Sequence, residues 1–325
     1  MCTVNVGTMV GKGREVVDML HRRRVDVCCV QEVRYKGSGA TTVGGGEEKY
    51  KFWYSGNEDG RGGVGIFVRY GLVEDVVQVV RTSDQVIRIE MVFGGRVYRI
   101  FSVYAPQAGR GAHERIEFFE RLEEEMRAVP EEEGLIVGGD LNGHVGRERD
   151  GYEEVLGCYG MGERNEQGEA ILDFCVSCEL KVANTYFKKD REKYITYKSG
   201  VVETQLDLLL YRKRRGLDVR DCGAIPGEAC LKQHRMVREK LRIEGVKKKK
   251  WKGQKKIRTW KLKDEEVRER FEETLEQKRL VGDGGWKQFA KDVLDAGMEV
   301  CGETSGRRGI ERERRGGGTK RYNGK

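Results

Sequence analysis

The stretch that decides the fold reads VGGDLNGHVG and occupies residues 137–146. It follows the apolar residues 134–136, so a short buried strand is predicted to end at Asp140. Because side chains alternate along a strand, Asp140 and Asn142 are expected to project to the same side, with Leu141 turned away. A carboxylate and a carboxamide placed together could bind a hard cation or hold a water. A polar turn is the alternative, because Asp, Asn and Gly are common turn residues.

Short apolar segments and fewer amphipathic ones alternate through residues 1–244. Strands are predicted at 25–31, 62–68, 86–93, 96–104, 134–140 and 205–211, and helices at about 13–23, 112–129 and 168–178. Gly94 and Gly95 separate two alternating runs, which is a strong hairpin signal. In the second helix an apolar stripe is expected to contain Ile116, Phe119, Leu122 and Met126. Many strands with interspersed helices indicate an α/β layered sandwich.

The bulk composition is typical of a soluble protein with a highly charged surface, because 38% of the residues are hydrophobic and 36% are charged. No apolar run approaches the length of about 20 residues that crosses a bilayer, and the N-terminus lacks a secretory h-region. Neither membrane insertion nor secretion is therefore expected. The nine cysteines show no paired metal-binding spacing and are expected to be reduced thiols of an intracellular protein.

The net charge of +8 is concentrated towards the C-terminus. Residues 245–325 contain 24 Lys and Arg against 14 Asp and Glu, whereas residues 1–244 carry a slightly negative balance. The segment KKKKWKGQKK (247–256) predicts an exposed basic linker over 245–262. Such a segment suits nucleic acid as a partner, and the alternatives are a solvated linker or a nuclear import signal.

Beyond the linker, the sequence predicts a short helical segment and a tail. Val267, Phe271 and Leu275 recur at helical spacing, so residues 263–304 are expected to be helical in part. Residues 305–325 offer almost nothing to bury and are expected to be disordered. The chain is therefore divided into one domain over 1–244 and a basic, partly helical C-terminal extension.

Polar side chains also stand at the ends of other predicted strands. Asn5 interrupts the first apolar stretch, Glu32 follows a buried run, and Tyr104 precedes a proline turn. Asp207 lies inside an apolar run, where an unpaired carboxylate is costly, and His234 precedes the last strand-like segment. Each alone is commonly a structural polar residue or a cap. Their occurrence together at strand ends favours a shared functional site.

In order and spacing, the segments NVGTM, QE, VYAP, GGDLN, QLDLLL and QHR resemble the endonuclease/exonuclease/phosphatase superfamily, which includes DNase I, abasic-site endonucleases and inositol polyphosphate phosphatases. The phrases CCVQEVRYKG, YGMGERNEQGEAILDFC and IPGEACLKQHR are most similar to endonucleases of RTE-type non-LTR retrotransposons and to craniofacial development protein 2-like proteins. The resemblance covers residues 1 to about 305. It implies a DNase I-like four-layer α/β sandwich, with the site at one end of the sheets.

The resemblance further implies a metal site and a water site. Glu32 would ligate Mg²⁺, with Mn²⁺ as an alternative, and Asn5 and Asp140 would complete the metal site. Asp140 would also position or deprotonate the attacking water, and Asn142 would donate to the scissile phosphate. An in-line phosphodiester hydrolysis needs this combination of nucleophile activation and charge neutralisation.

The other implied roles belong to His234, Asp207 and Tyr104. His234, held by Asp207, would stabilise the charge that develops on the phosphate, and Tyr104 would contact the phosphate or assist the leaving oxygen. Two positions depart from the family pattern. Gln233 stands where abasic-site endonucleases commonly carry Asp, and Gly7 where some relatives carry another acid. Both departures favour a single cation.

The sequence therefore predicts a Mg²⁺-dependent DNA endonuclease that nicks one strand and leaves a 3′-hydroxyl, derived from a retrotransposon. A nuclear or otherwise cytoplasmic location is expected. One alternative is a decayed or domesticated protein that binds nucleic acid or a partner without cutting. Another is a phosphatase acting on inositol phosphates or lipids, which the basic tail disfavours.

Overall fold

The computed structural model describes the chain except for residues 47, 108, 214–216, 244–256, 280–285 and 304–325. The chain divides into two compact units, Met1–Lys247 and Lys248–Lys325. Most of the predicted basic linker and the whole predicted disordered tail lie outside the described residues. Within the part of the chain that is described, no helix is long and apolar enough to span a membrane.

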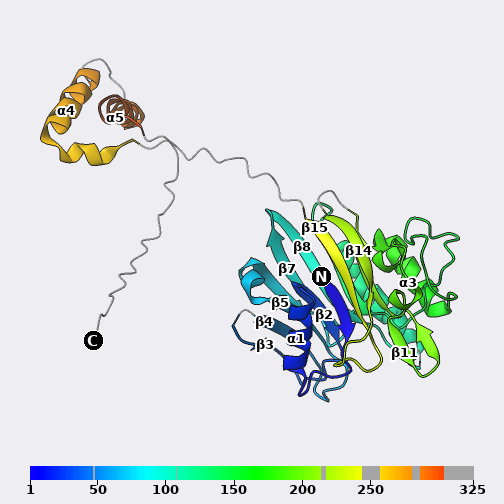
Figure 1. Ribbon diagram of the computed structural model, residues 1–325. Coiled ribbons are helices and arrows are strands. Elements are labelled where there is room, and N and C mark those ends of the chain that lie inside the picture. Colours follow the sequence, from blue (N-terminus) through cyan, green and yellow to red (C-terminus); the bar gives the residue numbers. More distant parts are fainter. Residues whose placement is uncertain (47, 108, 214–216, 244–256, 280–285, 304–325) are drawn as a thin grey trace, which may run out of the picture. The chain divides into compact units, whose positions relative to one another are not determined.

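Two large sheets form the first unit (Figure 1). The first contains β1 (Cys2–Asn5), β2 (Val27–Gln31), β3 (Ser38–Val43), β4 (Tyr50–Ser55), β5 (Val64–Arg69), β14 (Leu217–Ile225) and β15 (Met236–Ile243). The second contains β6 (Val76–Arg81), β7 (Val86–Phe93), β8 (Arg96–Tyr104), β9 (Gly134–Asp140), β10 (Leu180–Val182) and β13 (Asp207–Arg212). Over the described residues, the first sheet has the order β14-β15-β1-β2-β5-β4-β3 and the second the order β10-β13-β9-β8-β7-β6. A separate hairpin is formed by β11 (Tyr197–Ser199) and β12 (Val202–Thr204).

Helices cover the outer faces of both sheets. Helix α1 (Gly13–Arg22) packs on the first sheet, and α2 (Ala112–Arg127) and α3 (Glu166–Ser177) pack on the second. Short 3-10 turns occur at η1 (Tyr70–Asp75), η2 (Ala183–Thr185) and η3 (Arg191–Lys193). Two further apolar clusters lie between the sheets. The order helix, sheet, sheet, helix confirms the predicted four-layer α/β sandwich.

Strand β2 shows how the sequence builds two cores at once. Cys28 and Val30 face α1, whereas Val27 and Cys29 face the second sheet. Because alternate side chains are buried on opposite faces, the strand reads as a continuous apolar run rather than as an alternating pattern.

The two glycines of the decisive stretch lie where β9 meets its neighbours. A Cβ atom on Gly138 would lie 3.0 Å from Cys29 and 3.1 Å from Thr3, both in the other sheet. A Cβ atom on Gly139 would lie 2.4 Å from a methyl group of Val103 in the adjacent strand. Gly138 therefore lets the two sheets approach closely just below Asp140, and Gly139 makes room for Val103 within the second sheet.

Several predicted elements are confirmed, and the differences have physical causes. The hairpin joins β7 to β8, with φ of 59° at Gly94 and 82° at Gly95. Among the described strands, the four edge strands (β3, β6, β10 and β14) fall outside the predicted set, as does β4 beside β3. An edge strand packs against one neighbour only and so carries a weaker apolar signal.

The predicted stripe of α2 is wrong at one position. Ile116 is 55% exposed, whereas Phe118, Leu122 and Met126 are buried. Phe118, Leu122 and Met126 follow the helical repeat of four residues, which leaves Ile116 on the flank.

The second unit is helical where it is described. It contains η4 (Thr259–Lys263), α4 (Glu265–Arg279) and α5 (Trp286–Cys301). Ala296 and Cys301 of α5 are buried, and the small Gly297 lies within reach of Phe271 on α4. The predicted helical character of the C-terminal extension is confirmed.

Buried Arg212 at the end of β13 ties the two helices of the second sheet together. The side chain is 6% exposed, and its guanidinium donates at 3.3 Å to backbone carbonyls of Met126, Val129 and Cys178 at the ends of α2 and α3. Buried carbonyls that lose their donor each cost about 1–3 kcal/mol.

We expect Arg212→Met to lower the free energy of unfolding by about 2–4 kcal/mol, because the carbonyls of Val129 and Cys178 lose a donor. Urea unfolding followed by circular dichroism measures this loss. The matched control is Arg127→Met, where an exposed arginine pairs with Glu123 and the change should cost less than about 1 kcal/mol. Equal losses in the two variants would contradict the role given to Arg212.

Candidate active site at one end of the sandwich

Six strands bring polar side chains to one end of the sandwich. β1 runs parallel to β2, and β8 runs parallel to β9, so the carboxyl ends of these four strands lie together. β13 and β15 run antiparallel to β9 and β1 and begin at this same end. Asp140 lies opposite Tyr104 on one side and Asp207 on the other. The sheet register thus gathers residues that are far apart in the sequence.

Asn5 joins two carboxylates that belong to different sheets. Its Nδ2 donates to Glu32 Oε1 at 2.9 Å and to Asp140 Oδ2 at 3.0 Å. Its Oδ1 accepts the N–H of Gly7 at 2.9 Å. The amide N–H groups, not the oxygen, therefore face the two acids, and ligation of a metal through Oδ1 would require the amide to turn over.

Glu32 stands in a strained backbone conformation directly after β2. Its φ is 53°, a left-handed value that non-glycine residues rarely adopt and that often marks functional positions. Oε1 also accepts the Tyr104 hydroxyl at 3.2 Å, and Arg34 pairs with Oε2 at 2.7 Å. Burial alone would raise the pKa of Glu32, but the hydrogen bonds from Arg34 and Asn5 hold it below its usual value. Glu32 is therefore ionised at neutral pH.

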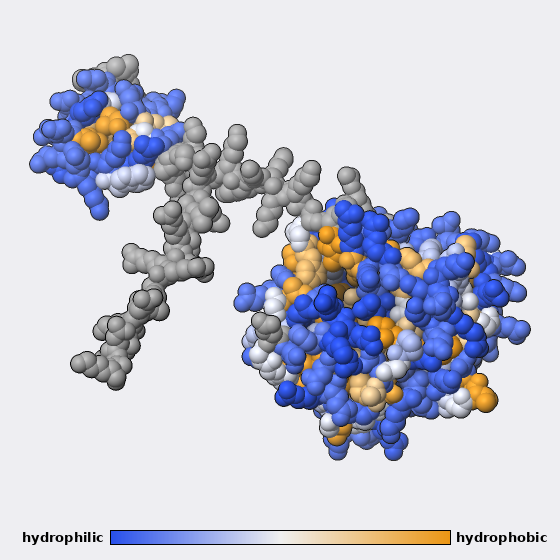
Figure 2. Space-filling model, in the orientation of Figure 1, coloured by the Kyte–Doolittle hydropathy of each residue, from blue (hydrophilic) through white to orange (hydrophobic). Residues whose placement is uncertain are grey.

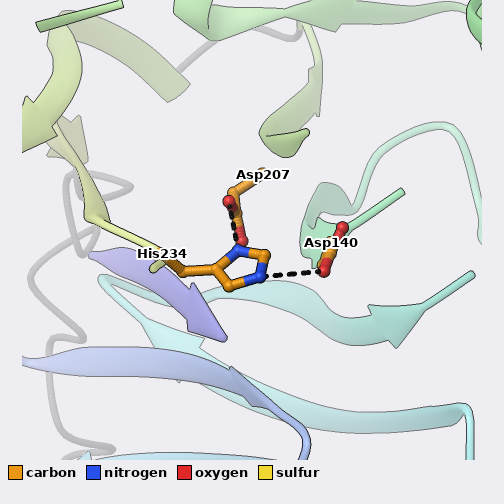
Figure 3. Close-up of side chains that lie close together, drawn as sticks. All are labelled: Asp140, Asp207 and His234. Carbon is orange, nitrogen blue, oxygen red and sulfur yellow. Dashed lines mark hydrogen bonds and ion pairs between the residues drawn. The ribbon is translucent and has the colours of Figure 1, made fainter. Parts of the chain in front are cut away.

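His234 lies between two aspartates, as Figure 3 shows. Its Nδ1 is 2.9 Å from Asp207 Oδ2, and its Nε2 is 3.8 Å from Asp140 Oδ2. Burial disfavours the charged imidazole, but the Asp207 carboxylate outweighs it and raises the pKa of His234 to about 9. The ring is therefore positively charged at neutral pH, and Asp207 fixes its orientation.

Asp140 is buried beside a like charge. Burial, together with the Asp207 carboxylate, raises the pKa of Asp140 to about 7, although His234 opposes this shift. A carboxylate with a pKa near the working pH can accept a proton from water efficiently.

Asn142 reaches this end of the sheets by a route that differs from the predicted one. The strand ends at Asp140, and Asn142 has φ of 50°, so simple strand alternation does not place it. Its backbone N–H donates to Asp140 Oδ1 at 3.2 Å, and its Nδ2 donates to the Ala105 carbonyl at 2.8 Å. A turn, and not an extended strand, therefore holds the carboxamide beside Asp140.

The Tyr104 hydroxyl is fixed by two hydrogen bonds. The hydroxyl donates to Glu32 and accepts from Gln107 Nε2 at 3.0 Å. Burial, with the Glu32 and Asp140 carboxylates nearby, raises the pKa of Tyr104. The phenol therefore stays protonated and remains a donor at physiological pH.

A buried polar network beneath the site was missed by the sequence reasoning. Gln31 Oε1 accepts from Thr3 at 3.3 Å, and Gln31 Nε2 donates to Ser102 Oγ at 3.1 Å and to the Gly138 carbonyl at 3.4 Å. It links four strands of two sheets directly under Asn5 and Asp140. An amide inside the apolar run before Glu32 is the signal that could have revealed it.

The Asp207–His234 pair has supports that sequence reasoning also missed. Thr196 Oγ1 accepts the backbone N–H of Asp207 at 3.0 Å, and Asn184 Nδ2 donates to the Asp207 carbonyl at 3.0 Å. The rings of Tyr197 and His234 meet at an interplanar angle of 63°, with 4.9 Å between their centroids. Gln233 donates to Ser199 at 3.2 Å, so its amide is engaged with the β11–β12 hairpin.

The donor set suits a hard divalent cation. Glu32 and Asp140 present carboxylate oxygens that share one amide donor, and such oxygens are the ligands Mg²⁺ prefers. Asp140, Asp207 and His234 also offer ligand atoms within 4.8 Å of one another. One buried oxygen of Asp207, Oδ1, has no hydrogen-bond partner within the described residues. Added positive charge would relieve the repulsion between the buried carboxylates.

Comparisons with known proteins relate the chain to one family and to a few individual proteins. The sequence profile of the Endonuclease/Exonuclease/phosphatase family matches residues 2–153. Craniofacial development protein 2 of Tragulus javanicus is 26% identical over 248 residues, which are 74% of this chain and 42% of that protein. A stretch of 69 residues is 41% identical to the transposon TX1 uncharacterized 149 kDa protein of Xenopus laevis, covering 19% of this chain and 5% of that protein. The chain thus spans less than half the length of these curated relatives.

Among solved structures, the AP endonuclease LMAP from Leishmania major matches with a TM-score of 0.53 at 13% identity, covering 75% of this chain and 87% of that one. This likeness shows the fold. Together with the family match, it confirms the resemblance inferred from the motifs.

We expect His234 to titrate with a pKa of about 9 in metal-free protein, and Asp207→Asn to lower that pKa by at least about one unit. Because the folded pKa lies above the unfolded one, protonation of His234 stabilises the fold. This contribution is complete below about pH 6.5 and is lost as the pH rises towards 9. Nuclear magnetic resonance of the imidazole, with EDTA present, measures the titration.

The matched control for this titration is Asp190→Asn, an exposed aspartate that lies outside the described site. This substitution should leave the pKa of His234 unchanged. A pKa near 6.5 in the unsubstituted protein would contradict the proposed pairing.

Proposed function

Because the chain resembles the endonuclease/exonuclease/phosphatase superfamily, we propose that the first unit is a Mg²⁺-dependent DNA endonuclease that nicks one strand and leaves a 3′-hydroxyl. The observation that carries the proposal is the double hydrogen bond from Asn5 to Glu32 and Asp140, next to the Asp207–His234 pair. These groups combine an ionised metal ligand, a base and a positive charge at one end of the sheets. Metal-assisted phosphodiester hydrolysis uses all three.

Glu32 and Asp140 would hold the cation. Glu32 is ionised, and the Asn5 amide holds Asp140 near it by donating a hydrogen bond to each carboxylate. When bound, Mg²⁺ would supply Lewis acidity to a phosphoryl oxygen. Mn²⁺ prefers similar oxygen ligands and is the alternative.

Asp140 would act on the attacking water, and His234 would act on the phosphate. Asp140 would position the water and accept its proton, a role that its raised pKa favours. His234 carries its positive charge within 3.8 Å of Asp140 and would offset negative charge on the phosphate. Asp207 would act through His234 by holding the ring and its proton.

Two uncharged donors complete the proposed machinery. Tyr104 keeps its hydroxyl proton, and this hydrogen bond would turn from Glu32 to the phosphate or the leaving oxygen. Asn142 uses one N–H for the Ala105 carbonyl, and its second N–H would serve the scissile phosphate.

DNA is favoured as the substrate by two observations of different kinds. One relative is a transposon protein, and one of the solved structures with a similar fold is an AP endonuclease. The excess positive charge in residues 245–325 suits a polyanion. The same lysine run favours a nuclear location.

We expect the purified chain to convert supercoiled plasmid to nicked circles with Mg²⁺ and not with EDTA. Glu32→Gln should reduce the rate by about 100-fold or more and raise the Mg²⁺ concentration needed, since a charged ligand is lost. Isothermal titration of Mg²⁺ supplies a readout besides activity. The control is Glu58→Gln, an exposed residue outside the site.

Nicking by Glu32→Gln at the normal rate in limiting Mg²⁺ would contradict the ligand assignment. Tight DNA binding without nicking by the unsubstituted chain would instead support a protein that binds nucleic acid and has lost catalysis.

We expect the lysines at 247–250 to contribute to DNA affinity by neutralising phosphates. Changing all four to Gln should flatten the plot of log affinity against log salt, by about 0.9 for each phosphate that is no longer neutralised. The nicking rate at saturating DNA should stay the same, because the proposed catalytic residues lie before residue 245. Fluorescence anisotropy at several salt concentrations measures the slope, and an unchanged slope would remove the lysines from the DNA interface.

A further inference from the structure

A groove of about 430 Å³ runs between α2 and α3 on the outer face of the second sheet. Its floor contains the buried side chains of Leu141 and Phe174 and the half-buried ring of Phe119. The Phe119 and Phe174 rings, from the two facing helices, have centroids 5.5 Å apart. The apolar area that Figure 2 shows between β8 and β15 is a separate feature, which lies between the sheets. The volume of the groove is within the range of binding pockets.

Each helix presents a complete stripe of its surface to this groove. The lining residues recur at helical spacing from Ala112 to Glu123 on α2 and from Glu166 to Ser177 on α3. Each stripe therefore extends over about three turns, or about 16 Å at 1.5 Å per residue. The two helices run in the same direction, because the carbonyls near both C-terminal ends accept from Arg212. The groove thus runs along two helical walls.

Apolar side chains of the groove are open to solvent. Ile116 is 55% exposed, and the small Ala112 and Ala170 are exposed on the facing helices. The sequence pattern assigns Ile116 to the apolar stripe of α2, and the structure places it in the wall of this groove instead of in the core. Exposed apolar surface that is rimmed by polar groups is typical of protein interaction sites.

The rims of the groove are acidic. Among the described residues that line it, Arg115 alone is basic, whereas the acids are Glu120, Glu123, Glu166 and Asp173. Within the described part of the chain, neither Glu120 nor Glu166 forms an ion pair. An acidic rim repels the phosphates of nucleic acid and attracts basic side chains. The chemistry of the groove therefore suits a protein segment that carries lysine or arginine.

The backbone of the walls favours a helical occupant over an extended one. The main-chain groups of α2 and α3 bond within each helix, so the walls offer side chains and no open strand edge. An extended segment would leave its own backbone groups without partners against the apolar floor, which is costly. A helix satisfies these groups internally, and the length of about 16 Å matches about three of its turns.

We propose that the groove between α2 and α3 binds an amphipathic helix of a partner protein. The helix would lay an apolar stripe against Ile116, Phe119 and Leu141. Basic residues beside the stripe would pair with Glu120 and Glu166. Helix-in-groove binding of this kind relies on apolar anchors spaced three and four residues apart. The inference does not depend on the proposed nuclease activity.

The test uses the full chain and a fluorescent fourteen-residue peptide, blocked at both ends. Leucines recur every three or four positions of this striped peptide, and lysines and alanines fill the others. We expect saturable binding by fluorescence anisotropy and a shift of the Ile116 methyl signals in nuclear magnetic resonance spectra. Ile116→Ala should weaken binding about five-fold, because an apolar contact is lost. The matched control is Val176→Ala, a residue of α3 that is 53% exposed outside the groove lining, and it should change binding less than about two-fold.

The acidic rim has a test of its own. Glu120→Gln should weaken binding of the striped peptide about three-fold and reduce its salt dependence, because one ion pair is lost. Glu124→Gln removes an equal charge from an exposed position of α2 outside the groove lining, and it should do neither. Equal effects of the two substitutions would contradict pairing at the rim.

A second peptide separates docking from simple ionic attraction. It has the same composition in a scrambled order that destroys the apolar stripe, and it should bind at least about ten-fold more weakly. Equal binding of the two peptides would overturn the proposal, as would equal effects of Ile116→Ala and Val176→Ala. An absence of saturable binding by the striped peptide would overturn it as well.

Two further outcomes would assign the groove to a different occupant and so overturn the proposal. Self-association of the chain that Ile116→Ala abolishes would make the occupant a second copy. Tighter peptide binding after the lysines at 247–250 are changed to Gln would make it the lysine segment of the chain itself. Plasmid nicking by Ile116→Ala should be normal, which keeps this test separate from that of the candidate active site.

Discussion

The site depends on one amide that spans the two sheets. Asn5 belongs to the first sheet, and its Nδ2 binds Glu32 of the same sheet and Asp140 of the other. Two hydrogen bonds to charged oxygens are stronger than ordinary ones, and they fix the distance between the acids. Such a bridge forms only if the sheets approach closely, which Gly138 permits by having no side chain towards Cys29 and Thr3. The bridge made by Asn5 therefore depends on a glycine at position 138.

The electrostatics of the site follow from this close approach. Asp140 and Asp207 are both buried, and their mutual repulsion is offset in part by the charged His234 between them. A buried carboxylate pair of this kind lowers stability unless counter-charge is present. The left-handed backbones of Glu32 and Asn142 add further strain. Repulsion and strain at one end of an otherwise well-packed sandwich are typical of sites shaped by function rather than by stability.

Sequence reasoning grouped most residues of the candidate site because they stand at predictable strand ends. Asn5, Glu32 and Asp140 follow buried runs, and the parallel register of β1 with β2 and of β8 with β9 brings those ends together. The position of Asn142 could not be derived from alternation, because a left-handed turn replaces the strand after Asp140. The interior network around Gln31 depends on interactions between sheets, which a single sequence does not encode locally. The edge strands were not predicted for a related reason, since many of their side chains are exposed and the strands therefore lack a clear apolar pattern.

The two ends of the sandwich differ in whether their buried polar groups have hydrogen-bond partners. At the end that carries the candidate site, Asn5, Tyr104 and His234 each bond to a carboxylate, and the repulsion that remains would be relieved by added positive charge. At the other end, Glu239 and Tyr98 are buried as deeply, yet no described side chain bonds to the oxygens of Glu239 or to the Tyr98 hydroxyl. Native proteins rarely leave such groups unsatisfied. The fold therefore pairs its buried polar groups where the candidate site is built and leaves two of them without a described partner at the opposite end.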